Sequence, residues 1–339
     1  MALKSEIVVV GGGVLGLCVA AELTARGHHV RHLDPGGRNA SSVAAGMIAP
    51  ALESALDGVT PERAALLREA AALWPEFARR MGIELKHDPA AWRGPEPERV
   101  VYSLRHLGFM ADLRDGAVWT DDRQVDPETA RMTLRARAGE RVIGQARSVE
   151  CASGEWRVRT DGDILTAPVL VLATGAAPAL PGLSSSVSRM IDGIQPIRGQ
   201  IGWTDRALGR GVTRGDGGYV AAMGAGAVIG ASMGEGRRDL DVDAAEAEAL
   251  RAVATALTGR ELPDADIDWR VGIRGATADG LPMAGPSGEA GLHLALAPRR
   301  NGWLLGPIVA RVVADGIEGR APGAHASALD PRRFSPPGC

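Results

Sequence analysis

The segment Gly11–Gly16 has the pattern GxGxxG and stands between a run of β-branched residues and a helical stretch. Each glycine of the pattern has its own purpose: Gly11 permits a tight turn, Gly13 lets the backbone approach a pyrophosphate, and Gly16 lets the helix pack on the strand. Asp34 follows Gly13 by 21 residues, at a place where a carboxylate can accept hydrogen bonds from ribose hydroxyls. Together these features predict a dinucleotide-binding site, against the alternative of an ordinary glycine-rich turn.

The elements around these residues alternate between strand and helix. The sequence predicts strands at 7–10, 29–33 and 169–172, a helix at 14–26, and a last helix at 306–316 entered through Pro307. Between them we expect helices at 61–81, 124–138 and 243–258, antiparallel strands over 83–123, and further strands over 198–235 and 270–306. The tail from residue 320 is rich in proline, alanine and glycine, and we expect it to be loosely held. This order predicts an α/β fold: a discontinuous Rossmann-like domain with an inserted antiparallel β-rich domain.

The composition excludes several classes of protein. The 339 residues are enough for one large domain or two interlocked ones, and a net charge of −3 gives no general attraction for nucleic acid or an anionic membrane. Proline or glycine interrupts the uncharged stretches at 164–183 and 217–234, so we expect no membrane-spanning helix. Three scattered cysteines and seven histidines show no ligand spacing, so we expect no metal site, no disulfide framework and a cytoplasmic setting.

Small residues fill positions 39–50, after the second predicted strand, in the run Asn39-Ala40-Ser41-Ser42-Val43-Ala44-Ala45-Gly46-Met47-Ile48-Ala49-Pro50. A flavin enzyme needs small residues and hydroxyls where its long cofactor passes, whereas an NAD enzyme has no evident use for them. Here the chain resembles the D-amino-acid oxidase family, most closely its glycine oxidase branch, which has an ASxAAAGM-type stretch at this place. Four further segments are similar to those of the family and follow in the same order: 171–176, 196–200, 272–282 and 300–307.

The resemblance implies non-covalently bound FAD, since no cysteine stands near residues 299–306 for a covalent link. It implies FAD-binding parts at 1–82, 140–197 and 269–325, and substrate-domain parts at 83–139 and 198–268. A turn at 302–305 and the helix dipole behind it would stabilise negative charge on the reduced ring. The residues expected to contact the cofactor are Gly11, Gly13, Val14, Leu15, Gly16, Asp34, Ser41, Ser42, Ala45, Gly46, Met47, Ala173, Gly175, Asn301, Gly302, Trp303, Leu304 and Leu305.

An amino-acid substrate presents a carboxylate, which the planar fork of an arginine can hold with two charge-assisted bonds. The resemblance points to Arg274 and Arg300 as this clamp, to the hydroxyl of Tyr219 as a helper, and to Met233 as a residue lining the site over the flavin. On residue type alone, an arginine is more often a solvated surface charge. Arg274 is less ordinary, because it stands in an apolar strand between glycines.

The chain departs from the glycine oxidase pattern at three places near these residues. Pro298 and Arg299 stand where a histidine and an aromatic residue usually precede the RNG sequence. Gly275 replaces the proline expected after Arg274, and the run 220–224 lacks the arginine usually found after the tyrosine. These departures concern the substrate pocket and leave the FAD assignment intact.

The resemblance implies oxidative deamination of glycine or a similar small amine or amino acid, for thiamine biosynthesis, in a possible homo-oligomer. The substrate would become an imine and then an oxoacid with release of ammonia, while molecular oxygen is reduced to hydrogen peroxide. One alternative is a dehydrogenase of the same fold that oxidises a D-amino acid or an N-substituted glycine and passes electrons to a quinone or carrier. Two others are an NAD-dependent dehydrogenase and a non-catalytic FAD-binding module.

Overall fold

The computed structural model describes residues 5–335, which divide into two compact units. The first unit comprises the described residues of Met1–Asn39, Arg131–Ile197 and Arg274–Cys339, and the second comprises Ala40–Ala130 and Arg198–Ile273. Residues 40–82, which the sequence assigns to the FAD-binding domain, pack in the second unit. Packing does not say which residues hold a cofactor, so the functional division stays a prediction.

A six-stranded sheet in the order β18-β19-β11-β1-β2-β7 forms the centre of the first unit. Neighbouring strands are parallel except β18 and β19, which are antiparallel. The central strand is buried over residues 7–10, as expected for a β-branched run covered on both faces. The strands are β1 (Glu6–Val10), β2 (His29–Asp34), β7 (Glu140–Ile143), β11 (Val169–Leu172), β18 (Met283–Pro286) and β19 (Leu292–Leu296).

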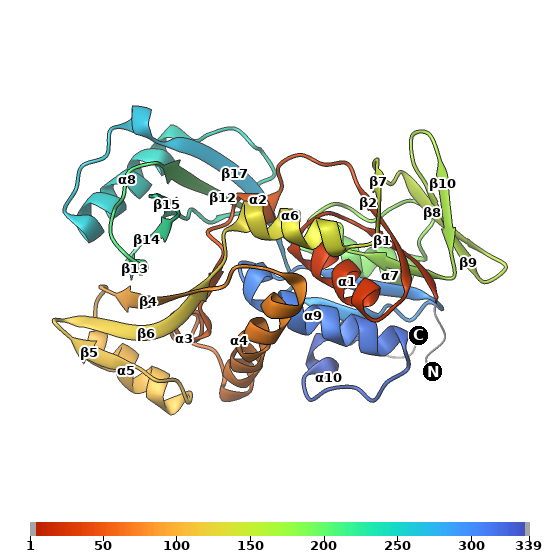
Figure 1. Ribbon diagram of the computed structural model, residues 1–339, viewed down its shortest axis with the longest axis horizontal. Helices are drawn as coiled ribbons and strands as arrows, with labels where there is room; N and C mark the ends of the chain where they lie inside the picture. The colour runs from red at the N-terminus through yellow and green to blue at the C-terminus, as the bar shows by residue number, and fades with distance from the viewer. Residues whose placement is uncertain (1–4, 336–339) are drawn as a thin grey trace. The chain divides into compact units, whose positions relative to one another are not determined.

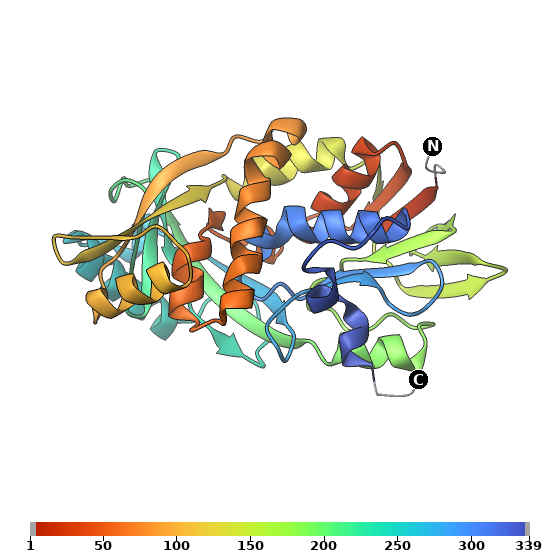
Figure 2. The same ribbon diagram turned by 90° about the horizontal axis from the view of Figure 1, so that it is seen from below.

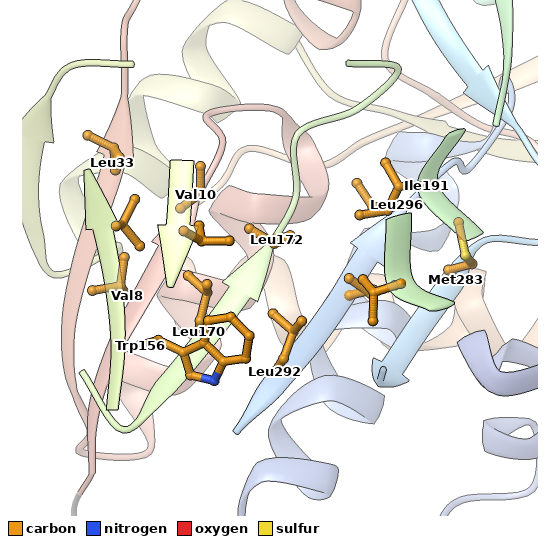
Figure 3. Close-up of a cluster of buried hydrophobic side chains, with 14 of the residues drawn as sticks. Val8, Val10, Leu33, Trp156, Leu170, Leu172, Ile191, Met283, Leu292 and Leu296 are labelled. Atoms are coloured by element: carbon orange, nitrogen blue, oxygen red, sulfur yellow. The ribbon is translucent and has the colours of Figure 1, made fainter. Parts of the chain in front are cut away.

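A hydrophobic core joins this sheet to a smaller antiparallel one of β8 (Ser148–Ala152), β9 (Glu155–Arg159) and β10 (Ile164–Ala167). Figure 3 shows Trp156 of the smaller sheet beside Leu170 of β11. The indole nitrogen of Trp156 donates a hydrogen bond to the carbonyl oxygen of Ala290 at 2.9 Å. Buried residues of α7 (Ser185–Asp192) complete the core.

Helices α1 (Val14–Ala25) and α9 (Gly302–Ile317) lie side by side in the first unit (Figure 1 and Figure 2). A Cβ atom added to Gly306 of α9 would lie 2.9 Å from the sulfur of Cys18 in α1, so the glycine permits this close approach. The sequence places the start of the last helix at 306, but the helix begins at Gly302 and carries Pro307 inside it. Trp303, Leu304 and Leu305 are buried, and we attribute the earlier start to their packing, which offsets the hydrogen bond lost at Pro307.

The expectation of a loosely held tail is wrong for the described residues after 320. This segment forms α10 (Ala326–Leu329) and a 3-10 turn, η2 (Pro331–Phe334). Leu329 is fully buried and Pro331 is buried too. Both elements pack against β18, so burial of two apolar residues outweighs the flexible composition of the tail.

The second unit contains a large mixed sheet in the order β16-β12-β15-β14-β13-β4-β6-β3, with β17 paired to β12 and β5 paired to β6. Two glycines allow a side chain to cross the sheet surface closely, at Gly202 under Trp269 and at Gly230 under Tyr219. The strands are β3 (Met47–Ile48), β4 (Lys86–Trp92), β5 (Asp112–Arg114), β6 (Ala117–Gln124), β12 (Gln195–Thr204), β13 (Val212–Gly215), β14 (Gly218–Met223), β15 (Gly226–Gly230), β16 (Gly234–Glu235) and β17 (Asp268–Ala276).

Helices cover parts of this sheet. The predicted helix at 61–81 is confirmed as α4 (Pro61–Met81), with Thr60 as its N-cap and Gly82 ending it in a left-handed conformation. The stretch 83–123 contains the expected antiparallel strands, but also α5 (Pro97–His106), which the sequence analysis missed. The remaining helical elements are α2 (Ala40–Val43), α3 (Pro50–Leu56), α8 (Ala244–Thr258) and η1 (Asp264–Asp266), with α6 (Pro127–Arg137) continuing into the first unit. Among residues 5–335, no helix has the length and apolar character needed to cross a membrane.

Candidate functional site

The predicted dinucleotide loop in the first unit leaves no room for side chains. A Cβ atom at Gly11 would lie 2.2 Å from the carbonyl oxygen of Ala173, and one at Gly16 would lie 2.0 Å from the carbonyl oxygen of Gly11. Gly11 has a φ of 122°, which disfavours other residues. Gly13 is the N-cap of α1 and makes no side-chain cap. The loop therefore brings bare backbone against Ala173 and Thr174 and leads directly into the N-terminus of α1, the kind of helix end that binds anions.

Asp34 lies at the end of β2, directly over this loop. A Cβ atom at Gly12 would be 2.2 Å from the Asp34 carboxyl group, so only glycine fits beneath it. Arg135 of α6 donates a hydrogen bond to Asp34 Oδ2 at 3.0 Å. Arg135 was not among the predicted site residues, because it lies 101 residues from Asp34 along the chain and no local pattern marks it. The arginine holds the carboxylate that is predicted to bind ribose.

Two polar side chains bind backbone carbonyl groups of the glycine loop. The Nδ2 group of Asn39 donates a hydrogen bond to the carbonyl oxygen of Gly12 at 3.1 Å. His32 Nε2 lies 3.1 Å from the carbonyl oxygen of Gly11, so that nitrogen carries the proton. Burial lowers the pKa of His32, although the bond to Gly11 opposes the shift. The ring is therefore neutral at pH 7 and brings no charge to the loop.

The residues 302–305, predicted to form a turn, are instead the first turn of α9. Asn301 is its buried N-cap residue, and the carbonyl oxygen of Asn301 accepts the first intrahelical bond, from the N–H of Leu305 at 2.8 Å. A Cβ atom at Gly302 would lie 3.1 Å from a methyl group of Val14, so α9 and α1 begin beside each other. The predicted positive helix end is present, in a helix that starts earlier than expected.

Arg274 and Arg300 are on adjoining segments of the first unit. The N–H of Arg299 donates to the carbonyl oxygen of Gly275 at 2.8 Å, and Ala276 forms an isolated bridge with Pro298. Both predicted clamp arginines are half-buried. Their segments are thus joined by backbone contacts, and the pairing of the two guanidinium groups stays a prediction.

The departure from the family pattern at Gly275 has a structural reason. A Cβ atom at Gly275 would lie 2.8 Å from a methyl group of Ile194, so the expected proline has no space here. Ala297 and Arg299 both have a left-handed backbone, with φ values of 58° and 52°. Non-glycine residues in this conformation carry strain and cluster at ligand-binding sites. The strained stretch leads directly into Arg300.

The small-residue segment lies in the second unit, with Ser41 and Ser42 on α2 and Ala45 to Met47 leading into β3. Gln124 Nε2 donates to the carbonyl oxygen of Ala45 at 2.9 Å, and the N–H of Val125 donates to that of Gly46 at 3.0 Å. Gly46 has a φ of 67°, and a Cβ atom there would lie 2.0 Å from the carbonyl oxygen of Val125. The segment is held by strand β6 and requires glycine at its centre.

Tyr219 is on β14, and its ring lies against Gly230 of the next strand. Its cross-strand partner is Arg214, a buried residue that the sequence analysis missed. Arg214 Nη1 donates to Glu53 Oε1 at 2.6 Å, and Nη2 lies 3.4 Å from the sulfur of Met47. Met233, the remaining predicted residue, follows β15 and is 40% exposed. Tyr219 and Met47 are thus both neighbours of Arg214, which forms a buried ion pair with Glu53.

A second buried acid lies on the same strand as Gln124. Asp122 is 2% exposed, and neither of its carboxyl oxygens has a hydrogen-bond partner among the described residues. Burial raises the pKa of Asp122 to about 7, with Arg214 opposing the shift and Glu53 adding to it. Within residues 5–335 no group of histidine, cysteine, aspartate or glutamate could hold a metal ion.

Comparison with known proteins agrees with this geometry. Residues 6–316 match the family DAO, described as FAD dependent oxidoreductase. The chain is 30% identical to the tRNA 5-methylaminomethyl-2-thiouridine biosynthesis bifunctional protein MnmC of Caulobacter sp., over 97% of this chain and 58% of that protein. It is 27% identical to a glycine oxidase of Geobacillus kaustophilus, over 93% of each chain, and 29% identical to a bifunctional protein ThiO/ThiG of Trichormus variabilis, over 92% of this chain and 52% of that one.

The chain therefore spans about half of the bifunctional relatives and nearly all of the glycine oxidase. A crystal structure of glycine oxidase from Geobacillus kaustophilus superposes with a TM-score of 0.81 at 25% identity, covering 98% of this chain and 100% of that one. The predicted fold and family are confirmed, and the glycine loop, the acid above it and the paired helix ends fit the cofactor. The chain belongs to the family of FAD-dependent oxidoreductases, and its cofactor is FAD.

Proposed function

We propose that the protein oxidises a small amino acid, glycine or a close relative, at the carbon beside its nitrogen. The observation that carries the proposal is the backbone connection between the segments of Arg274 and Arg300. Two guanidinium groups on one rigid backbone unit suit a substrate that presents a carboxylate. Similarity to glycine oxidases over nearly the whole chain supports the same substrate class.

The chemistry that bound FAD would supply is the acceptance of a hydride from the substrate Cα, with oxygen as the final acceptor and hydrogen peroxide as its product. The chain's own residues orient the substrate for this transfer: Arg274 and Arg300 bind the carboxylate, the hydroxyl of Tyr219 donates to it, and Met233 covers the site. The oxidised substrate is an imine, and its reaction with water gives an oxoacid and ammonia. Similarity to ThiO/ThiG proteins supports a role in thiamine biosynthesis. From the resemblance to glycine oxidases, we also propose that the protein forms a homo-oligomer.

Substitution of Arg274 by alanine tests the carboxylate anchor. We expect a yellow protein whose kcat/KM for the amino acid is roughly 30- to 5,000-fold lower, which corresponds to a loss of about 2–5 kcal/mol of transition-state stabilisation. Arg270 is a matched control, because it lies on the same strand but pairs with Asp268 and stacks on Trp203. Arg270→Ala should keep its kinetics. Unchanged kinetics of Arg274→Ala with every amine substrate would exclude Arg274 from the site.

A second candidate is a dehydrogenase that acts on an N-substituted glycine and passes electrons to another carrier. It is favoured by the 30% identity to MnmC, whose name places it in the synthesis of a methylaminomethyl group. Flavin bleaching without oxygen, with glycine, sarcosine, D-alanine and D-proline in turn, would identify the substrate. The peroxide yield under air then separates the two candidates: one peroxide per substrate oxidised supports the oxidase, and none supports the dehydrogenase.

A further inference from the structure

The loop that follows strand β17 is closed by its own hydrogen bonds. The hydroxyl of Thr277 donates to the carbonyl oxygen of Leu281 at 2.6 Å, and the N–H of Leu281 donates to Asp279 Oδ1 at 2.9 Å. The N–H of Gly280 donates to the carbonyl oxygen of Thr277 at 3.0 Å. The loop at 277–282 is therefore a defined turn, and it begins three residues after Arg274.

Arg333, from the segment near the end of the chain, binds this loop with two of its three guanidinium nitrogens. Its Nε and Nη2 groups donate to the two carboxylate oxygens of Asp279, at 2.7 and 3.2 Å. Nη2 also lies 2.9 Å from the carbonyl oxygen of Leu281 and 3.2 Å from that of Pro282. A fork-shaped donor that reaches a carboxylate and two carbonyl groups fixes orientation as well as distance.

The segment that carries Arg333 is itself anchored. Leu329 and Pro331 are buried, and Pro331 lies beside Gly285 of β18. Arg333 Nη1 donates to the carbonyl oxygen of Asp330 at 2.9 Å, and the guanidinium carbon lies 4.3 Å from the ring centre of Phe334. Although burial alone would raise the pKa of Asp279, the bond from Arg333 helps to hold it below its usual range. The contact is thus an ion pair at neutral pH.

The turn also controls the end of β17, where the predicted clamp lies. Gly275 and Ala276 stand between Arg274 and the turn, and both contact the segment of Arg299 and Pro298. A shift of the turn would therefore move the backbone beneath both predicted clamp arginines. We propose that Arg333 is a positioning residue, which fixes the exit of β17 and so sets where Arg274 and Arg300 hold the substrate carboxylate. This inference rests on the proposed function.

The test compares Arg333→Met with Arg332→Met in the FAD-loaded protein. Arg332 is the matched control, because it is the neighbouring arginine but its guanidinium group pairs with Asp330 of its own turn and not with the loop at 277–282. Acetate, a carboxylate without an amine, is titrated into each protein and its binding is followed by the flavin absorption spectrum. We expect the acetate Kd and the amino-acid KM to rise roughly 10-fold in Arg333→Met, with an unchanged Kd for FAD, and neither value to rise in Arg332→Met.

A purely structural role would give a different result: a lower melting temperature with unchanged acetate binding, which overturns the proposal. Asp279→Asn provides a second route if Arg333→Met does not fold, since asparagine keeps the shape of the turn and removes the charge. It should weaken acetate binding in the same direction, and acetate binding like that of the native protein in Asp279→Asn also overturns the proposal. Arg274→Ala separates the two proposals. If acetate binding is unchanged in Arg274→Ala, the proposed carboxylate anchor is wrong. If acetate binding is weakened in Arg274→Ala but unchanged in Arg333→Met, only the role of Arg333 is wrong.

Discussion

The glycine loop of the first unit and the buried charges of the second unit are built in opposite ways. In the loop, the structure depends on side chains that are absent, since a Cβ atom at Gly11, Gly12 or Gly16 would collide with backbone or with Asp34. In the second unit it depends on large charged side chains placed out of water, with Arg214 bound to Glu53. The loop is determined by glycines that stand close together in the sequence. The buried ion pair is determined by two residues that are far apart in the chain.

The largest expected effect tests the first half of this comparison. In Gly12→Val, the new side chain would occupy the position of the Asp34 carboxyl group, so most of the bound flavin should be lost on purification. The flavin absorbance per protein measures this loss. Gly162→Ala is the control, because nothing lies within 4 Å of a Cβ atom there, and it should stay fully yellow. A fully yellow Gly12→Val protein would show that the loop tolerates side chains.

A smaller effect, on stability, tests the second half. Arg214→Met would remove the cation that binds the buried carboxylate of Glu53, near the buried Asp122. Such a loss costs about 3–5 kcal/mol, to be measured by urea denaturation. Adding Glu53→Gln to the same chain should restore part of the stability, because the orphaned charge is then removed. If the single variant is as stable as the native protein, the ion pair has no role in folding the second unit.

The last expected effect is confined to high pH. The pKa of Asp122 is raised from 3.8 to about 7 in the folded protein, so the folded state binds this proton more tightly than the unfolded chain. The stabilisation is complete below about pH 4 and is lost as pH rises through 7. Asp122→Asn cannot ionise, so it should gain roughly 4 kcal/mol over the native protein at pH 8 and less than about 1 kcal/mol at pH 4. Denaturation curves at the two pH values measure the gain, and an equal effect at both would contradict a buried, titrating carboxyl.

The same comparison explains what the sequence could and could not predict. The loop from Gly11 to Gly16, the strand before it and Asp34 are linked by short-range rules, and the structure places them as expected. Arg214 and Glu53 are 161 residues apart, and residue type alone does not distinguish a buried arginine from an exposed one. The start of α9 was misplaced because a proline usually opens a helix, whereas here the burial of Trp303 and its neighbours extends the helix past it. The anchored tail was missed because its two buried apolar residues, Leu329 and Pro331, form no periodic pattern. The ion pair that also holds it joins Arg333 to Asp279, 54 residues away.

Two helices of the first unit begin beside each other, since Gly302 at the start of α9 touches Val14 at the start of α1. The positive ends of two macrodipoles therefore fall on one small volume. Peptide groups neither gain nor lose protons, so this attraction for a phosphate or a reduced ring stays constant when the acidity around the protein drifts. A lysine in the same place would offer a stronger charge, but one that its surroundings could switch off.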